Sequence, residues 1–260
     1  MRILFLGDIV GRPGRRAVRE MLPALKEKYE PHLIIANGEN AAGGNGITEE
    51  AAQELYDAGI DILTMGNHVW DRKEIYNFID RDKRIIRPAN YPPGTPGQGF
   101  TVVSVQDVKV GIVNLSGRVF LPPLECPFRS IDQILPLLQQ ETSLILVDFH
   151  AEATSEKVAF GWYVNGRVTA VIGTHTHIQT ADERILPGGT GYITDVGMTG
   201  PRDSVLGVKL EAVLKKFLTL QPVRFEVAGG ALQLNALFLE IDPQRNTTQA
   251  IERIQIIQEK

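Results

Sequence analysis

Cysteine is nearly absent from this chain of 260 residues, which contains only Cys126. A single thiol excludes an internal disulfide framework and any metal cluster held by several thiolates. No apolar run approaches the roughly 18 residues that a membrane-spanning helix needs. The first apolar run, residues 3–6, stops at Gly7 and Asp8, which predicts a strand and not a signal peptide. We therefore expect a cytoplasmic protein without a membrane partner.

Neither sign of charge dominates the sequence. Lys and Arg total 27 against 31 Asp and Glu, which gives a formal net charge of −4. This balance argues against a stable nucleic acid complex and against an acidic disordered tail. Hydrophobic residues make up 43% and charged residues 22%, as in ordinary globular proteins. The chain contains no internal repeat, low-complexity tract or linker, so we expect a single domain over residues 1–260.

Short apolar runs alternate with helical patterns, which predicts an α/β fold. The expected strands are residues 2–6, 33–36, 61–65, 144–149, 168–172 and 231–241, with a hairpin formed by residues 100–105 and 108–115. The expected helices are residues 13–29, bent or split at Pro23, a helix from the N-cap Thr48 to Gly59, and residues 131–140, 208–218 and 247–258. In the helix over 208–218, one stripe holds Leu210, Val213, Leu214 and Phe217. Proline and glycine predict a surface loop over residues 88–99.

Polar residues of ligand type directly follow five of the expected strands. They are Asp8, then Asn37-Gly38-Glu39-Asn40, then Gly66-Asn67-His68, then His150, and finally Gly173-Thr174-His175-Thr176-His177. In open α/β sheets, ligands bind at the carboxyl ends of the strands. Each signal alone has an ordinary explanation, such as a turn residue for Asp8 or a core histidine for His150. Their combination at five strand ends predicts a shared metal site, and only His32 among the five histidines lies elsewhere.

The residue types at these strand ends suit two divalent metal ions. Asp8 and Glu39 offer carboxylate oxygens, and Asn40 and Asn67 offer amide oxygens. Imidazole nitrogens come from His150, His175 and His177. This mixture favours iron or manganese, with zinc as the alternative, over calcium or a sulfur-ligated ion. Two carboxylates leave such a pair of ions with net positive charge, which would attract a phosphodiester.

The same motifs resemble those of a known family. Gly7-Asp8, Gly66-Asn67-His68 and the run from Gly173 to His177 resemble the calcineurin-like metallophosphoesterases. Asn37-Gly38-Glu39-Asn40, Asp148-Phe149-His150-Ala151-Glu152 and the run from Thr194 to Pro201 are similar to the bacterial YmdB-type phosphodiesterases. The resemblance extends from Asp8 to about Gly207. It implies a four-layer α/β sandwich, in which two packed mixed β-sheets are flanked by helices.

The sequence departs from the broad superfamily at two positions. Ile9 and Val10 follow Asp8, where the superfamily usually has an Asp-x-His pair, and Glu39 stands where an Asp usually bridges the metals. Both departures are typical of the narrower YmdB-type family. By this resemblance, Asp8, Asn40 and His177 would hold the first metal, Asn67, His150 and His175 the second, Glu39 would bridge them, and His68 would be a proton donor outside the ligand set.

The resemblance implies hydrolysis of small phosphodiesters, first of all 2′,3′-cyclic nucleotides to 3′-nucleotides, by a hydroxide that bridges the metals. For substrate contact we consider the loop that contains Thr199, Gly200 and Arg202, although Gly200 and Pro201 explain it equally well as a turn. The alternatives are a phosphomonoesterase or nuclease on the same metals, and a nucleotide-sensing regulatory protein without catalysis. His68 argues against a pure binder, which needs no proton donor. The sequence leaves a homo-oligomer open.

Overall fold

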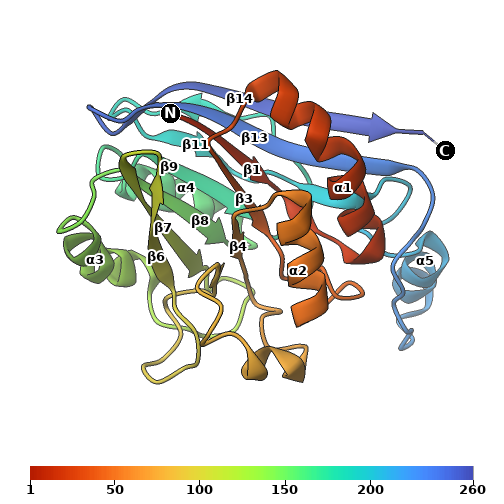
Figure 1. Cartoon of the computed structure of the whole chain (residues 1–260). Coiled ribbons are helices and arrows are strands. Elements are labelled where there is room, and N and C mark those ends of the chain that lie inside the picture. The colour runs from red at the N-terminus through yellow and green to blue at the C-terminus, as the bar shows by residue number, and fades with distance from the viewer. Residues whose placement is uncertain (260) are drawn as a thin grey trace.

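Two mixed β-sheets pack face to face in the computed structural model, which describes residues 1–259 (Figure 1). The strands of the first sheet are β1 (Arg2–Leu6), β2 (Asp8–Ile9), β3 (Leu33–Asn37), β4 (Ile62–Thr64), β5 (Ile85–Ile86), β12 (Met198–Pro201), β13 (Leu232–Asp242) and β14 (Thr247–Gln258). Their order is β2-β12-β13-β1-β3-β4-β5, and β14 also pairs with β13. Strands β1, β3, β4 and β5 are parallel, whereas β13 runs antiparallel to β1, β12 and β14.

The second sheet has six strands in the order β10-β11-β9-β8-β7-β6. They are β6 (Phe100–Val105), β7 (Val108–Ser116), β8 (Ile145–His150), β9 (Ala170–Thr174), β10 (Arg184–Ile185) and β11 (Gly191–Ile193). The helices are α1 (Gly11–Tyr29), α2 (Glu49–Ala58), α3 (Pro127–Leu138), α4 (Thr154–Tyr163) and α5 (Leu210–Thr219), with a short 3-10 helix at Lys73–Asn77. Strands β7, β8, β9 and β11 are parallel, so their carboxyl ends meet at one edge of the sheet.

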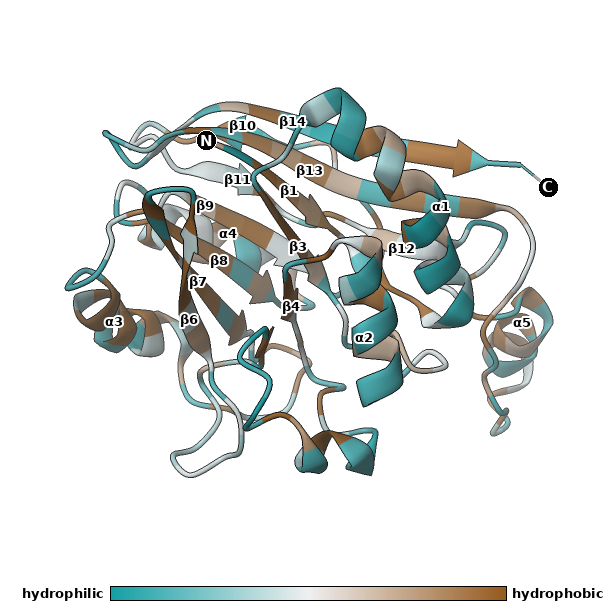
Figure 2. Cartoon of the chain, in the orientation of Figure 1, coloured by the Kyte–Doolittle hydropathy of each residue, from teal (hydrophilic) through white to brown (hydrophobic). Residues whose placement is uncertain are grey.

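Side-chain alternation along the strands produces four layers. In β1, Ile3 and Phe5 belong to the core between the sheets, and Leu4 and Leu6 belong to the core beneath α1 and α2. A third core joins the outer face of the second sheet to α3 and α4. Figure 2 shows these strands as mostly hydrophobic, whereas α1 and α2 carry long hydrophilic stretches. The predicted four-layer sandwich of two mixed sheets flanked by helices is confirmed.

Several local predictions hold to within a few residues. Helix α2 begins after Thr48, whose hydroxyl accepts the amide of Ala51, and ends at Gly59, which has φ +107°. The predicted hairpin is the antiparallel pair β6 and β7. Pro23 does not split α1, which is one continuous helix from Gly11. The carbonyl that Pro23 leaves without a partner belongs to Arg19, and both residues are exposed, so water can reach it.

The predicted C-terminal helix over residues 247–258 is wrong, because this segment is the long strand β14. It pairs with β13 along its whole length. Six of its twelve residues are β-branched (Thr247, Thr248, Ile251, Ile254, Ile256 and Ile257). Such residues favour strands. The apolar pattern of this segment fits a helix and a strand, and hydrogen bonding to the edge of β13 favours the strand.

Helix α5 forms where it is predicted, but most of its apolar stripe is exposed. Only Val213 is buried, whereas Phe217 is 76% exposed. The apolar periodicity therefore predicts the helix correctly, but most of the apolar stripe does not pack against the described part of the chain. Within residues 1–259, no helix combines the length and the apolar composition needed to cross a membrane.

Candidate metal centre

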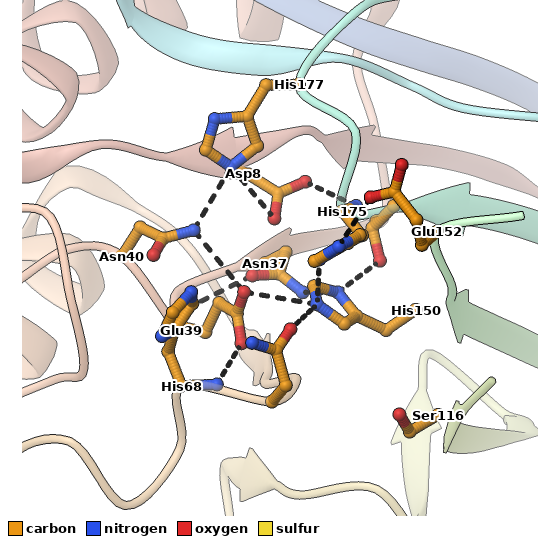
Figure 3. Close-up of polar contacts among 12 residues, drawn as sticks. Asp8, Asn37, Glu39, Asn40, His68, Ser116, His150, Glu152, His175 and His177 are labelled. Atoms are coloured by element: carbon orange, nitrogen blue, oxygen red, sulfur yellow. Dashed lines mark hydrogen bonds and ion pairs between the residues drawn. The ribbon is translucent and has the colours of Figure 1, made fainter. Parts of the chain in front are cut away.

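The five predicted strand ends converge in space (Figure 3). Asp8 follows β1, Glu39 and Asn40 follow β3, and Asn67 and His68 follow β4, all from the first sheet. His150 ends β8, and His175 and His177 follow β9, all from the second sheet. The two sheets thus contribute opposite walls of one site, and the seven predicted ligands come together there with His68.

One half of the site surrounds Nε2 of His150. This atom lies 3.1 Å from Oε1 of Glu39, 3.0 Å from Oδ1 of Asn67 and 3.0 Å from Nδ1 of His175. Glu39, His150 and His175 each offer a ligand atom, and these atoms all lie within 4.8 Å of one another. Glu39 and His150 are fully buried. This cluster could hold a metal ion.

The other half of the site surrounds Nε2 of His177. This atom lies 3.2 Å from Nδ2 of Asn40 and 3.7 Å from Oδ1 of Asp8. Nδ2 of Asn40 also donates to Oε1 of Glu39 at 3.4 Å. Glu39 therefore lies between the two halves, in contact with His150 on one side and Asn40 on the other.

Buried polar side chains hold His150 through hydrogen bonds on the Nδ1 side of its ring. Asn37, Asp148, His150 and Thr174 lie at the ends of β3, β8 and β9, where strand alternation points them between the sheets. Nδ1 of His150 lies 2.9 Å from the hydroxyl of Thr174, which donates to Oδ1 of Asp148 at 2.7 Å. Asn37 donates to the other oxygen of Asp148 at 3.4 Å. This network fixes the ring so that Nε2 is free to bind a ligand.

His175 and His177 lie on a loop whose backbone is strained. Their φ angles are 102° and 66°, in the left-handed region that side chains other than glycine rarely adopt. Asp195 holds this loop, because its Oδ2 accepts the amide of Thr176 at 3.0 Å and the ammonium of Lys157 at 2.5 Å. Lys157 also donates to the carbonyl of Thr174 at 2.6 Å. Both charged groups are buried, so the ion pair is shielded from water.

Carboxylates dominate the electrostatics of the site. Burial raises the pKa of Asp8 and raises that of Asp148 to about 6. Burial acts in the same direction on Glu39, but the charge of His150 and hydrogen bonds from His150 and His68 outweigh it and lower its pKa to about 2. Burial lowers the pKa of His150, but the Glu39, Asp8 and Asp148 carboxylates outweigh it and raise it to about 9. The carboxylates around His150 therefore favour a positive charge in this part of the site.

The donor set fits divalent metal ions. Oδ1 of Asp8 is buried and has no hydrogen-bond partner, which is the orphaned oxygen that a cation would satisfy. Burial, and after it the charge of His150, lower the pKa of His175 to about 3. The amide of Asn40 presents its nitrogen to His177, and a half-turn about its last torsion exchanges nitrogen and oxygen.

His68 stands apart from the ligand set. Its side chain is 33% exposed, and its Nδ1 lies 2.8 Å from Oδ2 of Asp71. Its backbone amide donates to Oε2 of Glu39 at 2.8 Å, which ties its position to the centre of the site. Because Asp71 engages Nδ1, the other ring nitrogen is available for proton transfer.

The predicted substrate residues occupy a different setting. Thr199 and Gly200 lie in β12, where Met198 pairs with Asp8 and Thr199 with Ile9. The strand thus supports the backbone that carries Asp8. Arg202 is exposed and forms an ion pair with Glu259 at 2.8 Å. A role of these residues in substrate binding stays a prediction.

Sequence reasoning missed the residues that support the ligands. Asp148 and Thr174 could have been found, because each shares its strand face with a residue of the inter-sheet core two positions earlier. Glu152, whose Oε2 lies 3.0 Å from Nε2 of His175, follows His150 by two residues. Lys157 gives no such signal, because its partner Asp195 is distant in sequence.

Gly66 allows the ring of His150 to reach the site, so we expect Gly66→Ala to displace it. A Cβ on Gly66 would overlap three atoms of that ring. The loss of one ligand should lower metal affinity at least about tenfold, the scale seen when only a supporting group is lost. Metal content after dialysis measures the effect. Gly229→Ala is the control, because nothing lies within 4 Å of its added Cβ, and equal metal content in both variants would contradict this geometry.

Comparison with known proteins places this geometry in a family. Residues 4–254 match the family described as YmdB-like protein. A 2′,3′-cyclic-nucleotide 2′-phosphodiesterase of Bacillus subtilis is 55% identical over 98% of this chain and 97% of its own length. A hypothetical protein from Thermus thermophilus is 43% identical, with a TM-score of 0.93 over 99% of this chain and 100% of that one. A novel phosphatase of Mycoplasma pneumoniae is 38% identical, with a TM-score of 0.95 over 100% of this chain and 94% of that one. Because the match spans almost the whole chain and includes every strand end that forms the site, this chain belongs to the YmdB-like protein family.

Proposed function

We propose that this chain hydrolyses 2′,3′-cyclic nucleotides to 3′-nucleotides at a centre of two divalent metal ions, iron or manganese. The observation that carries the proposal is the cluster of buried Glu39 and His150 with partly buried His175, beside an Asp8 oxygen that has no hydrogen-bond partner. The Bacillus subtilis relative, 55% identical, is named for this substrate class. A small nucleotide also suits a site built at strand ends rather than along an extended basic groove.

The ligands divide into two groups in this proposal. Asp8, Asn40 and His177 would hold the first ion, and Asn67, His150 and His175 the second. Glu39 would bridge them, which agrees with its contacts to His150 on one side and Asn40 on the other. When bound, the ions supply Lewis-acid activation of water and of the phosphate oxygens.

The residues of the chain then govern orientation and proton transfer. The oxygen of water forms a bond to phosphorus as one water proton is released to solvent, and the bond between phosphorus and O2′ breaks. O2′ takes a proton from His68, which is then protonated again from solvent. Asp71 engages Nδ1 of His68, so the proton leaves from Nε2. The hydrogen bond that the backbone amide of His68 donates to Oε2 of Glu39 holds the proton donor beside the carboxylate that would bridge the ions.

A substrate panel tests this function. The purified protein, loaded in turn with Mn²⁺ and Fe²⁺, is assayed on 2′,3′-cyclic nucleotides, p-nitrophenyl phosphate and a short RNA, and the products are identified by NMR. We expect the highest kcat/KM on the cyclic nucleotides and only the 3′-monophosphate as product. A preference for the monoester or the RNA would replace the proposal with a phosphatase or a nuclease. Tight nucleotide binding without turnover would replace it with a regulatory protein.

His68→Ala should retain metal but lower kcat on 2′,3′-cyclic nucleotides by about 10²–10⁴-fold, the usual contribution of a general acid. Methyl p-nitrophenyl phosphate, whose leaving group departs as a stable anion, should be affected far less. Steady-state kinetics on both substrates, with metal analysis of the same samples, measure the difference. Equal losses on the two substrates would remove His68 from the role of proton donor.

A further inference from the structure

Phe120 is the most exposed large hydrophobic side chain among the described residues, at 88%. It also has φ 62°, a left-handed conformation that is uncommon for a residue other than glycine, asparagine or aspartate. Exposure of an aromatic ring and backbone strain both cost free energy. Such a combination persists where the surrounding structure imposes it, and it is concentrated at functional sites.

The loop that carries Phe120 begins at the candidate metal centre. It leaves the end of β7, where Ser116 pairs with His150 in the parallel register (Figure 3). The amide of Gly117 donates to the carbonyl of His150 at 2.9 Å. Two residues separate Gly117 from Phe120, and the three Cα–Cα steps between them span at most about 11 Å. Phe120 therefore lies within the length of a nucleotide of Gly117, the residue that follows β7 and contacts His150.

Buried polar groups hold this loop in place. The carboxylate of Glu156, only 9% exposed, accepts the amide of Arg118 at 3.0 Å and that of Val119 at 3.2 Å. Asn90, also buried, donates to the carbonyl of Ser116 at 2.8 Å and to that of Glu125 at 2.9 Å. The backbone is thus anchored at both ends of the loop and directly before Phe120, whose side chain lies outside the core.

We propose that Phe120 is the stacking surface for the nucleobase of the substrate, whose cyclic phosphate lies at the metal centre. This inference rests on the proposed function and extends it to the part of the nucleotide that the metal ligands do not contact. An exposed aromatic ring on an anchored loop suits a base because every base has a π-face, and stacking requires no match of hydrogen bonds. The site should therefore accept all four bases and favour the purines, whose larger rings overlap more.

The test compares substrates with and without a base. Kinetics are measured for the wild type, Phe120→Ala, Phe120→Trp and the control Phe217→Ala on adenosine 2′,3′-cyclic phosphate and on ribose 2,3-cyclic phosphate. We expect Phe120→Ala to raise KM for the adenosine substrate about tenfold, the scale of losing one base–aromatic stack, with kcat retained. The base-free substrate should be unaffected, and Phe120→Trp should restore the wild-type KM. Phe217, which is 76% exposed on α5, should tolerate alanine on both substrates.

Three results would overturn the inference. Unchanged KM in Phe120→Ala, or an equal rise for both substrates, would show that the ring does not contact the base. A change in molecular mass by light scattering with unchanged kinetics would assign Phe120 to a protein contact. If the wild type hydrolyses neither substrate, the proposed function fails separately. In that case, equilibrium dialysis measures the affinities of the wild type and Phe120→Ala for adenosine 3′-monophosphate and ribose 3-phosphate. A loss of affinity in Phe120→Ala for the adenosine compound alone would support the stacking role.

Discussion

Removal of divalent metal ions with a chelator is expected to lower hydrolysis of 2′,3′-cyclic nucleotides by about a thousandfold or more. The reason is that metal ions stabilise the charge of a phosphoryl transition state by several kcal/mol and also activate water. General acid catalysis by His68 contributes less, so it cannot sustain turnover alone. Initial rates before and after dialysis, and after Mn²⁺ or Fe²⁺ is restored, measure the effect.

The variant His150→Ala tests whether the metal dependence arises at this site. Nε2 of His150 faces Glu39, Asn67 and His175 at once, so its loss removes a ligand and opens the centre of the cluster. His32→Ala is the matched control, because His32 lies outside the site, where its Nδ1 accepts the amide of Arg2. We expect metal content and activity to fall in His150→Ala and to stay unchanged in His32→Ala. Full activity after chelation would contradict the metal centre itself.

Lys157→Met should destabilise the protein by about 3–5 kcal/mol, the range measured when one partner of a buried ion pair is removed. Lys157 and Asp195 are 1% and 0% exposed, and their contact is 2.5 Å long. Without the ammonium, the Asp195 carboxylate stays buried without its counter-charge, and the carbonyl of Thr174 loses a donor. Because the same carboxylate holds the strained loop of His175 and His177, metal affinity should fall together with stability. Denaturant titration and metal analysis measure the two effects.

Two further variants separate the buried charge from the loss of a lysine. Lys209→Met removes a lysine whose ion pair with Glu226 is exposed, and it should lower stability far less than Lys157→Met. The double variant Lys157→Met with Asp195→Asn removes both charges of the buried pair, so it should recover part of the stability lost in the single variant. A single variant as stable as Lys209→Met would contradict the importance of the buried pair.

The position of the site could be predicted from the sequence because two simple rules govern it. A buried strand ends where its apolar run ends, and the carboxyl ends of parallel strands meet at one edge. Asp8, Glu39 and Asn67 in the first sheet, and His150 and His175 in the second, satisfy both rules. The packing of the two sheets, which these rules do not give, then brings the two groups together.

The identity of β14 could not be predicted in the same way. Its apolar residues match a helical stripe and a strand alternation about equally well, and the choice depends on the free edge of β13. Lys157 and Glu156 were also hidden, since nothing in the sequence of α4 shows that Asp195 or the backbone of residues 118–119 lies against it. Contacts between elements distant in sequence, rather than local pattern, determine these details.

The pairing of β1 with β13 sets the order in which the protein can mature on the ribosome. Strand β1 lies between β13 and β3, and the amide of Gly7, next to Asp8, donates to the carbonyl of Asn235 at 3.0 Å. Strand β1 therefore pairs on one edge with a strand that follows it by more than two hundred residues, since Leu6 lies opposite Ala236. Such distant pairings also make folding slow. The sheet that carries Asp8 is complete only after β13 has been synthesised, so we expect metal ions to bind there after that point.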